Sequence, residues 1–347
     1  MNLLRPEPVD PAGAGIVDAS VPVERGVEWL LAGRTLVVTD RYPTAVSLQT
    51  ALQEALEPPA VDAGHGPRRA YRRRLREASG RLLVPVRRGR LLVERAPTVG
   101  LLAELYPERG RIHLPVREVQ RLNRADEVFR RGVPLAVLGH ALHPFYGTYV
   151  PSRTSHLELF ATWLSGWEGE RRRAIDVGTG SGVLALLLAR AGFAEVVATD
   201  TNPNALHSLQ LELARRPQPV RGVGGDLLAG ERGPFDVIVF NPPWLHGTVE
   251  ELLDQALYYE DPSVFERFFD QALEGLAPGG RIVVLFSDIG RLVQPDVPHP
   301  IEVELARGRL ERVQKLRRKV KGARTERGRR RTKERVEVWE LARTPEL

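Results

Sequence analysis

The chain of 347 residues contains no cysteine, a single methionine and only 6% aromatic residues. Without cysteine, disulfide bonds and thiolate metal sites are excluded, and we find no spacing of metal-ligating residues. No apolar run reaches the length of about 18 residues typical of a membrane-spanning helix. The opening stretch, MNLLRPEPVDPAGAG, has no apolar segment of signal-peptide length. These absences predict a cytoplasmic protein that holds no metal and does not enter a membrane.

Lysine is also scarce, because only four of the fifty basic residues are lysine. The positive charge is concentrated near the C-terminus, where Arg307–Arg335 contains fifteen basic residues against three glutamates. Since the net charge of the whole chain is only +6, the remainder is net negative. Arginine suits bidentate phosphate contacts better than lysine, and a tract without aromatic residues indicates contacts to phosphates rather than bases. The alternative is a solvated charged hairpin.

The length predicts two domains. Residues 1–25 show little pattern and are expected to be loosely ordered, and residues 116–131 have the apolar spacing of a helix. The stretch RLLVPVRRGRLLVERAP predicts two short strands around a turn at Arg88 and Gly89. We predict a smaller α+β domain at residues 1–140, which recognises the substrate and whose fold has no clear signature, followed by a catalytic domain at residues 141–347.

Strands alternate with helices through the second domain, which predicts an α/β fold with a parallel sheet. The last two strands, RLERVQKL and ERVEVWELA, predict an antiparallel pair at one edge. Ligands of such sheets bind at the carboxyl ends of the strands. Four segments that end strands should therefore lie side by side: Asp176–Gly182, Asp200, Asp226 and Asn241–Trp244.

The loop IDVGTGSG ends a strand and opens a helix. Its glycine spacing is one residue shorter than the dinucleotide fingerprint, which disfavours a nicotinamide oxidoreductase. Asp176, two residues before the first glycine, would repel a pyrophosphate and favour a ligand with an ammonium group. Asp200 ends the next strand, where a carboxylate can bind both ribose hydroxyls, and Asp226 follows the third strand, where it could contact an adenine amino group.

These residues resemble motif I and the following motifs of class I S-adenosylmethionine-dependent methyltransferases, over roughly residues 140–345. The resemblance implies a Rossmann-like seven-stranded class I methyltransferase sheet with S-adenosyl-L-methionine as cofactor. It places the glycine loop around the methionine end, Asp200 at the ribose, and Asp226 with Leu227 at the adenine. The implied cofactor-binding residues are Asp176, Gly178, Thr179, Gly180, Gly182, Asp200, Thr201, Asp226, Leu227 and Asn241.

The sequence NPPW resembles the [N/D]-P-P-[Y/F/W] motif of amino-methylating enzymes in the small-domain methyltransferase superfamily. An amide or exocyclic amino nitrogen is a poor nucleophile because its lone pair is delocalised. The carbonyl oxygens of Asn241 and Pro242 can each accept an N–H, which directs the lone pair towards the methyl group. The prolines fix these acceptors in advance, and Trp244 offers a face to a planar substrate. The implied catalytic residues are Asn241, Pro242, Pro243 and Trp244.

The segment FYGTYVPSRTSH partly matches a segment that lines the cofactor pocket in glutamine and adenine methyltransferases of this type. Tyr146, Gly147, Pro151, Arg153 and Thr154 match, whereas the second proline and the glutamate of that pattern are missing.

The basic tract joins the last parallel strand to the terminal strand, so it should project beside the catalytic pocket. We therefore predict N-methylation of a base in RNA, with ribosomal RNA as the leading substrate, and the stretch Arg68–Arg81 could extend the RNA footprint. One alternative is a protein glutamine methyltransferase similar to the release-factor enzymes. Another is a non-catalytic RNA-binding scaffold. The candidate RNA-binding residues are Arg318, Lys319, Lys321, Arg329, Arg330 and Arg331.

Overall fold

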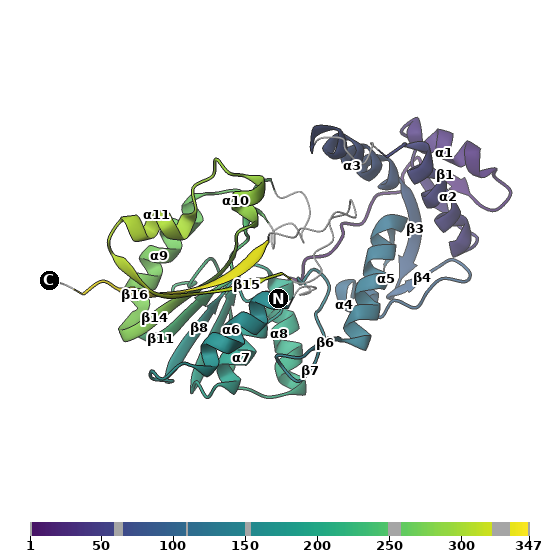
Figure 1. Cartoon of the computed structure of the whole chain (residues 1–347). Coiled ribbons are helices and arrows are strands. Elements are labelled where there is room, and N and C mark those ends of the chain that lie inside the picture. The colour runs from purple at the N-terminus through teal and green to yellow at the C-terminus, as the bar shows by residue number, and fades with distance from the viewer. Residues whose placement is uncertain are drawn as a thin grey trace. The chain divides into compact units, whose positions relative to one another are not determined.

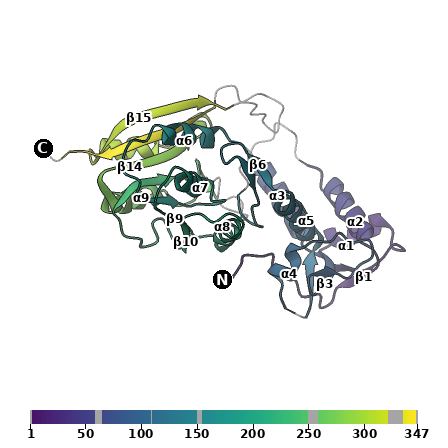
Figure 2. The same cartoon turned by 90° about the horizontal axis from the view of Figure 1, so that it is seen from below.

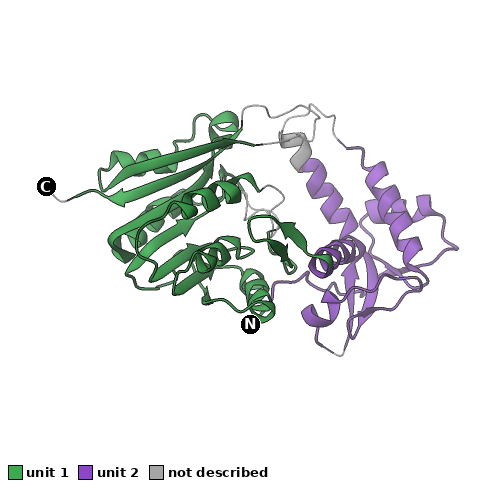
Figure 3. Cartoon of the chain, turned by 60° about the horizontal axis from the view of Figure 1, so that its bottom comes forward, with its two compact units in different colours: residues 1–2, 131–347 green, residues 3–130 purple. Residues whose placement is uncertain are grey.

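The computed structural model describes residues 2–58, 65–108, 110–149, 154–248, 258–320 and 334–345 (Figure 1). The chain forms two compact units, an N-terminal unit of Leu3–Arg130 and a C-terminal unit that begins at Arg131 (Figure 3). The division therefore lies ten residues before the predicted boundary at residue 140. The reason is the hairpin of β6 (Val133–Leu135) and β7 (His140–Leu142), whose leucines are buried in the core of the C-terminal unit.

The C-terminal unit contains a seven-stranded sheet in the order β10-β9-β8-β11-β14-β16-β15. The first five strands in this order run parallel, and β16 is antiparallel to both of its neighbours. The predicted parallel sheet, its antiparallel pair at one edge and the seven-stranded form implied by the resemblance are confirmed. The strands are β8 (Arg173–Val177), β9 (Glu195–Asp200), β10 (Val220–Gly224), β11 (Phe235–Phe240), β14 (Leu276–Ser287), β15 (Leu310–Lys319) and β16 (Arg335–Arg343).

Helices cover both faces of this sheet (Figures 1 and 2). One core joins α6 (Ser155–Ser165), α7 (Val183–Arg190) and α8 (Pro203–Arg215) to one face of the strands, and a second core joins α9 (Ser263–Gly275) to the other face. Successive strand residues point to opposite faces. Strands buried on both faces read as continuous apolar runs, which explains sequences such as FDVIVF in β11.

Short elements follow β11 and β14 at the edge of the sheet at which the parallel strands end. After β11, the two-residue strand β12 (Leu245–His246) pairs with β13 (Tyr258–Tyr259). After β14, the chain forms α10 (Ile289–Val293), and α11 (Pro300–Ala306) then leads into β15.

No helix in the described part of the chain has both the length and the apolar character needed to cross a membrane.

The N-terminal unit has a mixed sheet in which β1, β2 and β3 are parallel and β4 and β5 are antiparallel to β3. The predicted strands around Arg88 and Gly89 are confirmed. The expectation of a loosely ordered segment 1–25 is wrong, because Gly15–Val17 forms β1. The elements are β1 (Gly15–Val17), α1 (Val23–Leu31), β2 (Leu36–Val38), α2 (Tyr42–Ala55), α3 (His65–Ser79), β3 (Leu82–Arg87), β4 (Arg90–Leu91), α4 (Leu101–Leu105), β5 (Arg111–Pro115) and α5 (Val116–Arg131).

Candidate cofactor and substrate site

The register of the strands brings the predicted site segments together. Val177, the last residue of β8, pairs with Phe240 of β11 on one side and with Thr199 of β9 on the other. Asp200 pairs in turn with Gly224 of β10. The glycine loop, Asp200 and Asn241 therefore leave neighbouring strands at the same edge of the sheet, where the topology of open α/β sheets places ligands.

Hydrogen bonds donated by its own backbone N–H groups hold the loop between β8 and α7 in place. The Thr179 N–H donates to the Thr199 carbonyl at 2.8 Å, and the Gly180 N–H donates to Asp200 Oδ2 at 2.8 Å. Gly180 has a φ of +53°, and a Cβ at this position would meet no atom within 4 Å. Gly182 has a φ of +83°, and its Cβ would lie 2.9 Å from Leu209 Cδ1. Gly180 thus leaves free space beside the loop, while Gly182 allows close helix packing.

Asp176 is buried, with 1% of its surface exposed. Its Oδ2 accepts hydrogen bonds from the Thr179 hydroxyl at 2.6 Å and from the Ala185 N–H at 3.0 Å. Its Oδ1 has no hydrogen-bond partner among the described residues. Burial raises the pKa of Asp176 to about 7, although these two hydrogen bonds oppose the shift. A cationic ligand would give Oδ1 its missing partner and return the pKa towards its usual value.

Asp200 is fixed by three backbone donors. Its Oδ2 accepts from Gly180 N and its Oδ1 accepts from Asn202 N, both at 2.8 Å, and the Thr201 N–H also donates to this carboxylate. Burial raises the pKa of Asp200, and the backbone donors oppose this effect. The carboxylate is therefore held in one orientation with lone pairs left over, which suits a diol such as a ribose.

Two asparagines that the sequence analysis missed anchor the segment before α6. Asn202 caps α8, and its Nδ2 donates to the Gly147 carbonyl at 2.9 Å. Asn204 Nδ2 donates to the Tyr146 carbonyl at 2.8 Å. The available signal was Asn-Pro at a helix start, which is typical of an N-cap followed by proline at N1. The matched Tyr146 and Gly147 are thus attached to the helix that follows Asp200. Of the other matched positions, Thr154 precedes α6, and those at 151 and 153 lie outside the described residues.

The residues predicted at the adenine differ in environment. Leu227 is buried with a φ of +50°, and its carbonyl accepts from the Thr199 hydroxyl at 2.6 Å. Asp226 is exposed, and its carboxylate forms an ion pair with Arg267 of α9. The backbone of Leu227 is therefore fixed beside the end of β9, whereas the Asp226 side chain already has a cationic partner.

The NPPW corner contains two buried polar atoms without partners in the described structure, Asn241 Oδ1 and Trp244 Nε1. Leaving a buried polar group unpaired costs about 1–3 kcal/mol, so such groups mark strained or functional positions. The Trp244 ring packs against both cores and contacts His156 of α6 edge to face, with ring centroids 5.5 Å apart. The side chain of Gln294 bonds to both backbone groups of His246 in β12. Its Oε1 accepts from His246 N at 3.1 Å, and its Nε2 donates to His246 O at 2.6 Å.

The two strands that flank residues 320–334 of the basic tract meet at this same edge. Lys319, the last residue of β15, pairs with Arg335, the first of β16, and Val336 pairs with Ser287 at the end of β14. Lys319 is exposed, whereas Arg318 forms an ion pair with Glu158 of α6 at 2.7 Å. The other candidate RNA-binding residues, Lys321, Arg329, Arg330 and Arg331, lie outside the described residues. Across the ranges that are described, no three His, Asp or Glu side chains form a group that could hold a metal ion.

Residues 158–289 match the family described as methyltransferase small domain. The release factor glutamine methyltransferase of Deinococcus radiodurans is 40% identical over 126 residues, which are 33% of this chain and 45% of that protein. The ribosomal RNA small subunit methyltransferase C of Alcanivorax borkumensis is 32% identical over 32% of this chain and 31% of that protein. The crystal structure of the ribosomal protein L11 methylase from Lactobacillus delbrueckii subsp. bulgaricus has 20% identity and a TM-score of 0.40, over 59% of this chain and 86% of that one.

The chain spans about half the length of the curated relatives it matches, at 45% for the first and 64% for the second. The matched segment extends from α6 to the start of α10 and contains the glycine loop, Asp200, Asp226 and the NPPW corner. For this segment, the predicted resemblance to methyltransferases is confirmed.

Proposed function

We propose that the protein transfers a methyl group from S-adenosyl-L-methionine to an exocyclic amino nitrogen, most plainly that of a base in RNA. The observation that carries the proposal is the buried Oδ1 of Asn241, which has no partner among the described residues. Asn241 follows Phe240, which pairs with Val177 at the start of the glycine loop. A second strand, which ends in Asp200, flanks that loop on its other side.

The cofactor fits the charges at this edge. The ammonium group of its methionine end would pair with Asp176 Oδ1, the one carboxylate oxygen of that residue without a partner. The ribose hydroxyls would donate to Asp200, which its backbone donors hold in place. Gly178, Thr179, Gly180 and Gly182 would line the methionine end, while Thr201, Asp226 and Leu227 would line the ribose and adenine. When bound, the cofactor supplies a methyl group on a positively charged sulfur.

The corner at Asn241 would bind and orient the nucleophile. Asn241 Oδ1 accepts one N–H of the amino group and the Pro242 carbonyl accepts the other, which pulls the nitrogen towards tetrahedral geometry. Pro243 restrains the backbone so that little ordering is lost on binding. The nitrogen oriented in this way would receive the methyl carbon as the cofactor's carbon–sulfur bond breaks, and the methylated nitrogen would then release a proton to water. No residue is required as a general base, because the nitrogen becomes acidic only after transfer.

The excess of positive charge in Arg307–Arg335 favours RNA as the substrate class. The connection between β15 and β16 begins and ends at the edge that carries Asn241, and it contains seven of the fifteen basic residues of Arg307–Arg335. Phosphate neutralisation supplies a large share of the affinity of nucleic-acid-binding proteins. Trp244 would contribute one exposed part of its ring to stacking, with the remainder anchored against the two cores.

The second candidate is a protein glutamine methyltransferase. It is favoured by the similarity of residues in this segment to a release factor glutamine methyltransferase, at 40% identity over 126 residues. A glutamine side-chain amide presents the same NH₂ group to Asn241, so the corner itself fits both substrates.

The test supplies tritiated S-adenosyl-L-methionine and purified protein to total RNA and, separately, to total protein from a strain that lacks the gene. We expect label in RNA at a single nucleoside, with the rate of labelling reduced on the order of 100-fold when the Asn241→Ala variant replaces the wild type. Label confined to protein would establish the second candidate instead. Absence of label in both, together with no cofactor binding, would support the scaffold alternative.

A further inference from the structure

The sheet of the N-terminal unit ends in arginines that face one another across three strands. Arg87, the last residue of β3, pairs with Arg90 of β4 on one side and with Arg111 of β5 on the other. Residues paired in this way point to the same face, with Cβ atoms about 4.5–5.5 Å apart. All three side chains are exposed. We call Arg87, Arg90 and Arg111 the arginine row.

No carboxylate in the described part of the chain lies within 4.0 Å of a guanidinium group of the arginine row. Asp10 is nevertheless close to this edge: burial and Arg111 lower the pKa of His113, two residues along β5 from Arg111, and the Asp10 carboxylate opposes that shift. Like charges placed opposite one another destabilise a sheet, so the row is unfavourable for the isolated protein. Other arginines of the same unit do have a carboxylate within that distance: Arg5 at 2.7 Å, Arg25 at 3.8 Å, Arg41 at 3.7 Å and Arg121 at 3.3 Å.

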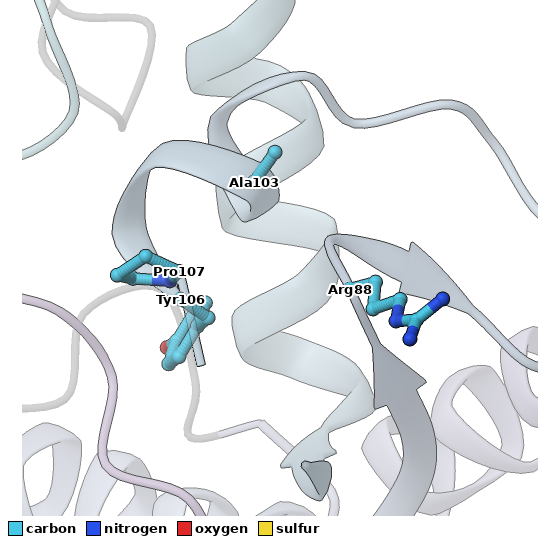
Figure 4. Close-up of a pocket in the computed structure, with 4 residues that line it drawn as sticks. All are labelled: Arg88, Ala103, Tyr106 and Pro107. Atoms are coloured by element: carbon cyan, nitrogen blue, oxygen red, sulfur yellow. The ribbon is translucent and has the colours of Figure 1, made fainter. Parts of the chain in front are cut away.

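The turn that joins β3 to β4 packs against α4. Arg88 and Gly89 have φ angles of +49° and +69°, the pair of positive values that a tight hairpin turn needs. A Cβ on Gly89 would lie 2.6 Å from Ala103 Cα, so the turn packs directly on the helix backbone. Arg88 borders a pocket with Ala103, Tyr106 and Pro107 (Figure 4). The row and Arg88 are therefore carried by a rigid frame, which lowers the ordering cost of binding.

We propose that the arginine row, with Arg88 beside it, binds the phosphate backbone of RNA, an inference that rests on the proposed RNA substrate. Neighbouring strands are about 4.8 Å apart, so the row extends over roughly 10 Å. This length favours a polyanion over a single phosphate ion. Arginine binds phosphate oxygens in a bidentate manner, and the row contains no aromatic side chain that could read bases. The N-terminal unit would thus hold the substrate through contacts independent of sequence.

The test measures binding of fluorescein-labelled polyuridylate to the full chain over a series of salt concentrations. The variant R87Q/R90Q/R111Q should bind at least tenfold more weakly at low salt. The slope of log K against log salt should fall by about 2, as expected for three lost contacts to a single strand. The matched control is R25Q/R41Q/R121Q, which removes the same charge from the same unit at arginines that have their own carboxylates. The control should bind polyuridylate within about twofold of the wild-type affinity and should leave the slope of log K against log salt unchanged.

Equal losses in both variants would show that only net charge matters and would overturn the proposal. So would a row variant that binds polyuridylate like the wild type but loses binding to polyglutamate, because the partner would then be an acidic protein. R111Q alone should raise the melting temperature at low salt, with the gain lost at high salt. A lower melting temperature would show that the row is structural.

Methyl transfer separates this inference from the proposed function. If the wild type methylates RNA and the row variant still binds RNA normally, the inference fails and the proposed function stands. If the wild type transfers methyl groups only to protein, the proposed RNA substrate fails whatever the row binds.

Discussion

The carboxylate of Asp176 gives the cofactor-free protein a measurable dependence on pH. Burial raises its pKa from 3.8 to about 7, so the folded state binds the proton more tightly than the unfolded chain does. The resulting stabilisation is complete below the unfolded pKa and is lost as the pH rises through the folded pKa. A shift of about 3 units corresponds to roughly 4 kcal/mol, of which about 2–3 kcal/mol is lost between about pH 5 and about pH 8.

Asp176→Asn removes this titration with little change of shape. The asparagine Oδ1 can accept the hydrogen bonds of Thr179 and Ala185 that Oδ2 now accepts, and its Nδ2 takes the place of the unpartnered Oδ1. Urea unfolding of both proteins without cofactor should show that the free energy of unfolding of the variant, relative to wild type, increases by about 2–3 kcal/mol from about pH 5 to about pH 8.

The same variant should bind S-adenosyl-L-methionine at least tenfold more weakly at neutral pH, as measured by isothermal titration calorimetry, because the ammonium group loses its carboxylate. A stability difference that stays constant with pH would refute the raised pKa. Normal cofactor affinity would refute the pairing with the ammonium group.

Three further changes test other parts of the account. Asp200→Ala should weaken cofactor binding by at least tenfold in the same calorimetric assay, and unchanged affinity would remove Asp200 from the ribose site. Gly182→Ala should lower the free energy of unfolding by about 1–3 kcal/mol in urea titrations, because its φ is positive and its Cβ would lie 2.9 Å from Leu209 Cδ1; a stability equal to wild type would show that the loop relaxes freely. Charge reversal of Arg329, Arg330 and Arg331 should weaken RNA binding and flatten its salt dependence, and intact binding would exclude the basic tract from the RNA footprint.

The C-terminal unit could be predicted in detail because its signals are local. The parallel strands β8, β9 and β11 are largely buried and therefore appear as apolar runs, and the predicted site residues lie near the carboxyl ends of strands, such as Asp200 in EVVATD. The carboxyl ends of such strands meet at one edge by topology, so Asp176, Asp200 and Asn241 could be grouped without coordinates.

The N-terminal unit and the support around the site could not be predicted in the same way. β1 has only three residues and is defined by its pairing with β2, which leaves no periodicity to detect. The bonds of Asn202 and Asn204 to carbonyls more than fifty residues earlier in the chain depend on tertiary contacts. The division between the two units lies before residue 140 because the β6–β7 hairpin packs by burial of its leucines, which a change in sequence texture does not reveal.

The central claim is that Asn241 orients the amino group that receives the methyl group, and the most direct measurement is the transfer rate of Asn241→Ala alongside its cofactor affinity. The variant should bind S-adenosyl-L-methionine within about threefold of wild type and transfer methyl groups on the order of 100-fold more slowly. A rate near that of wild type, or a loss explained entirely by weaker cofactor binding, would contradict the claim.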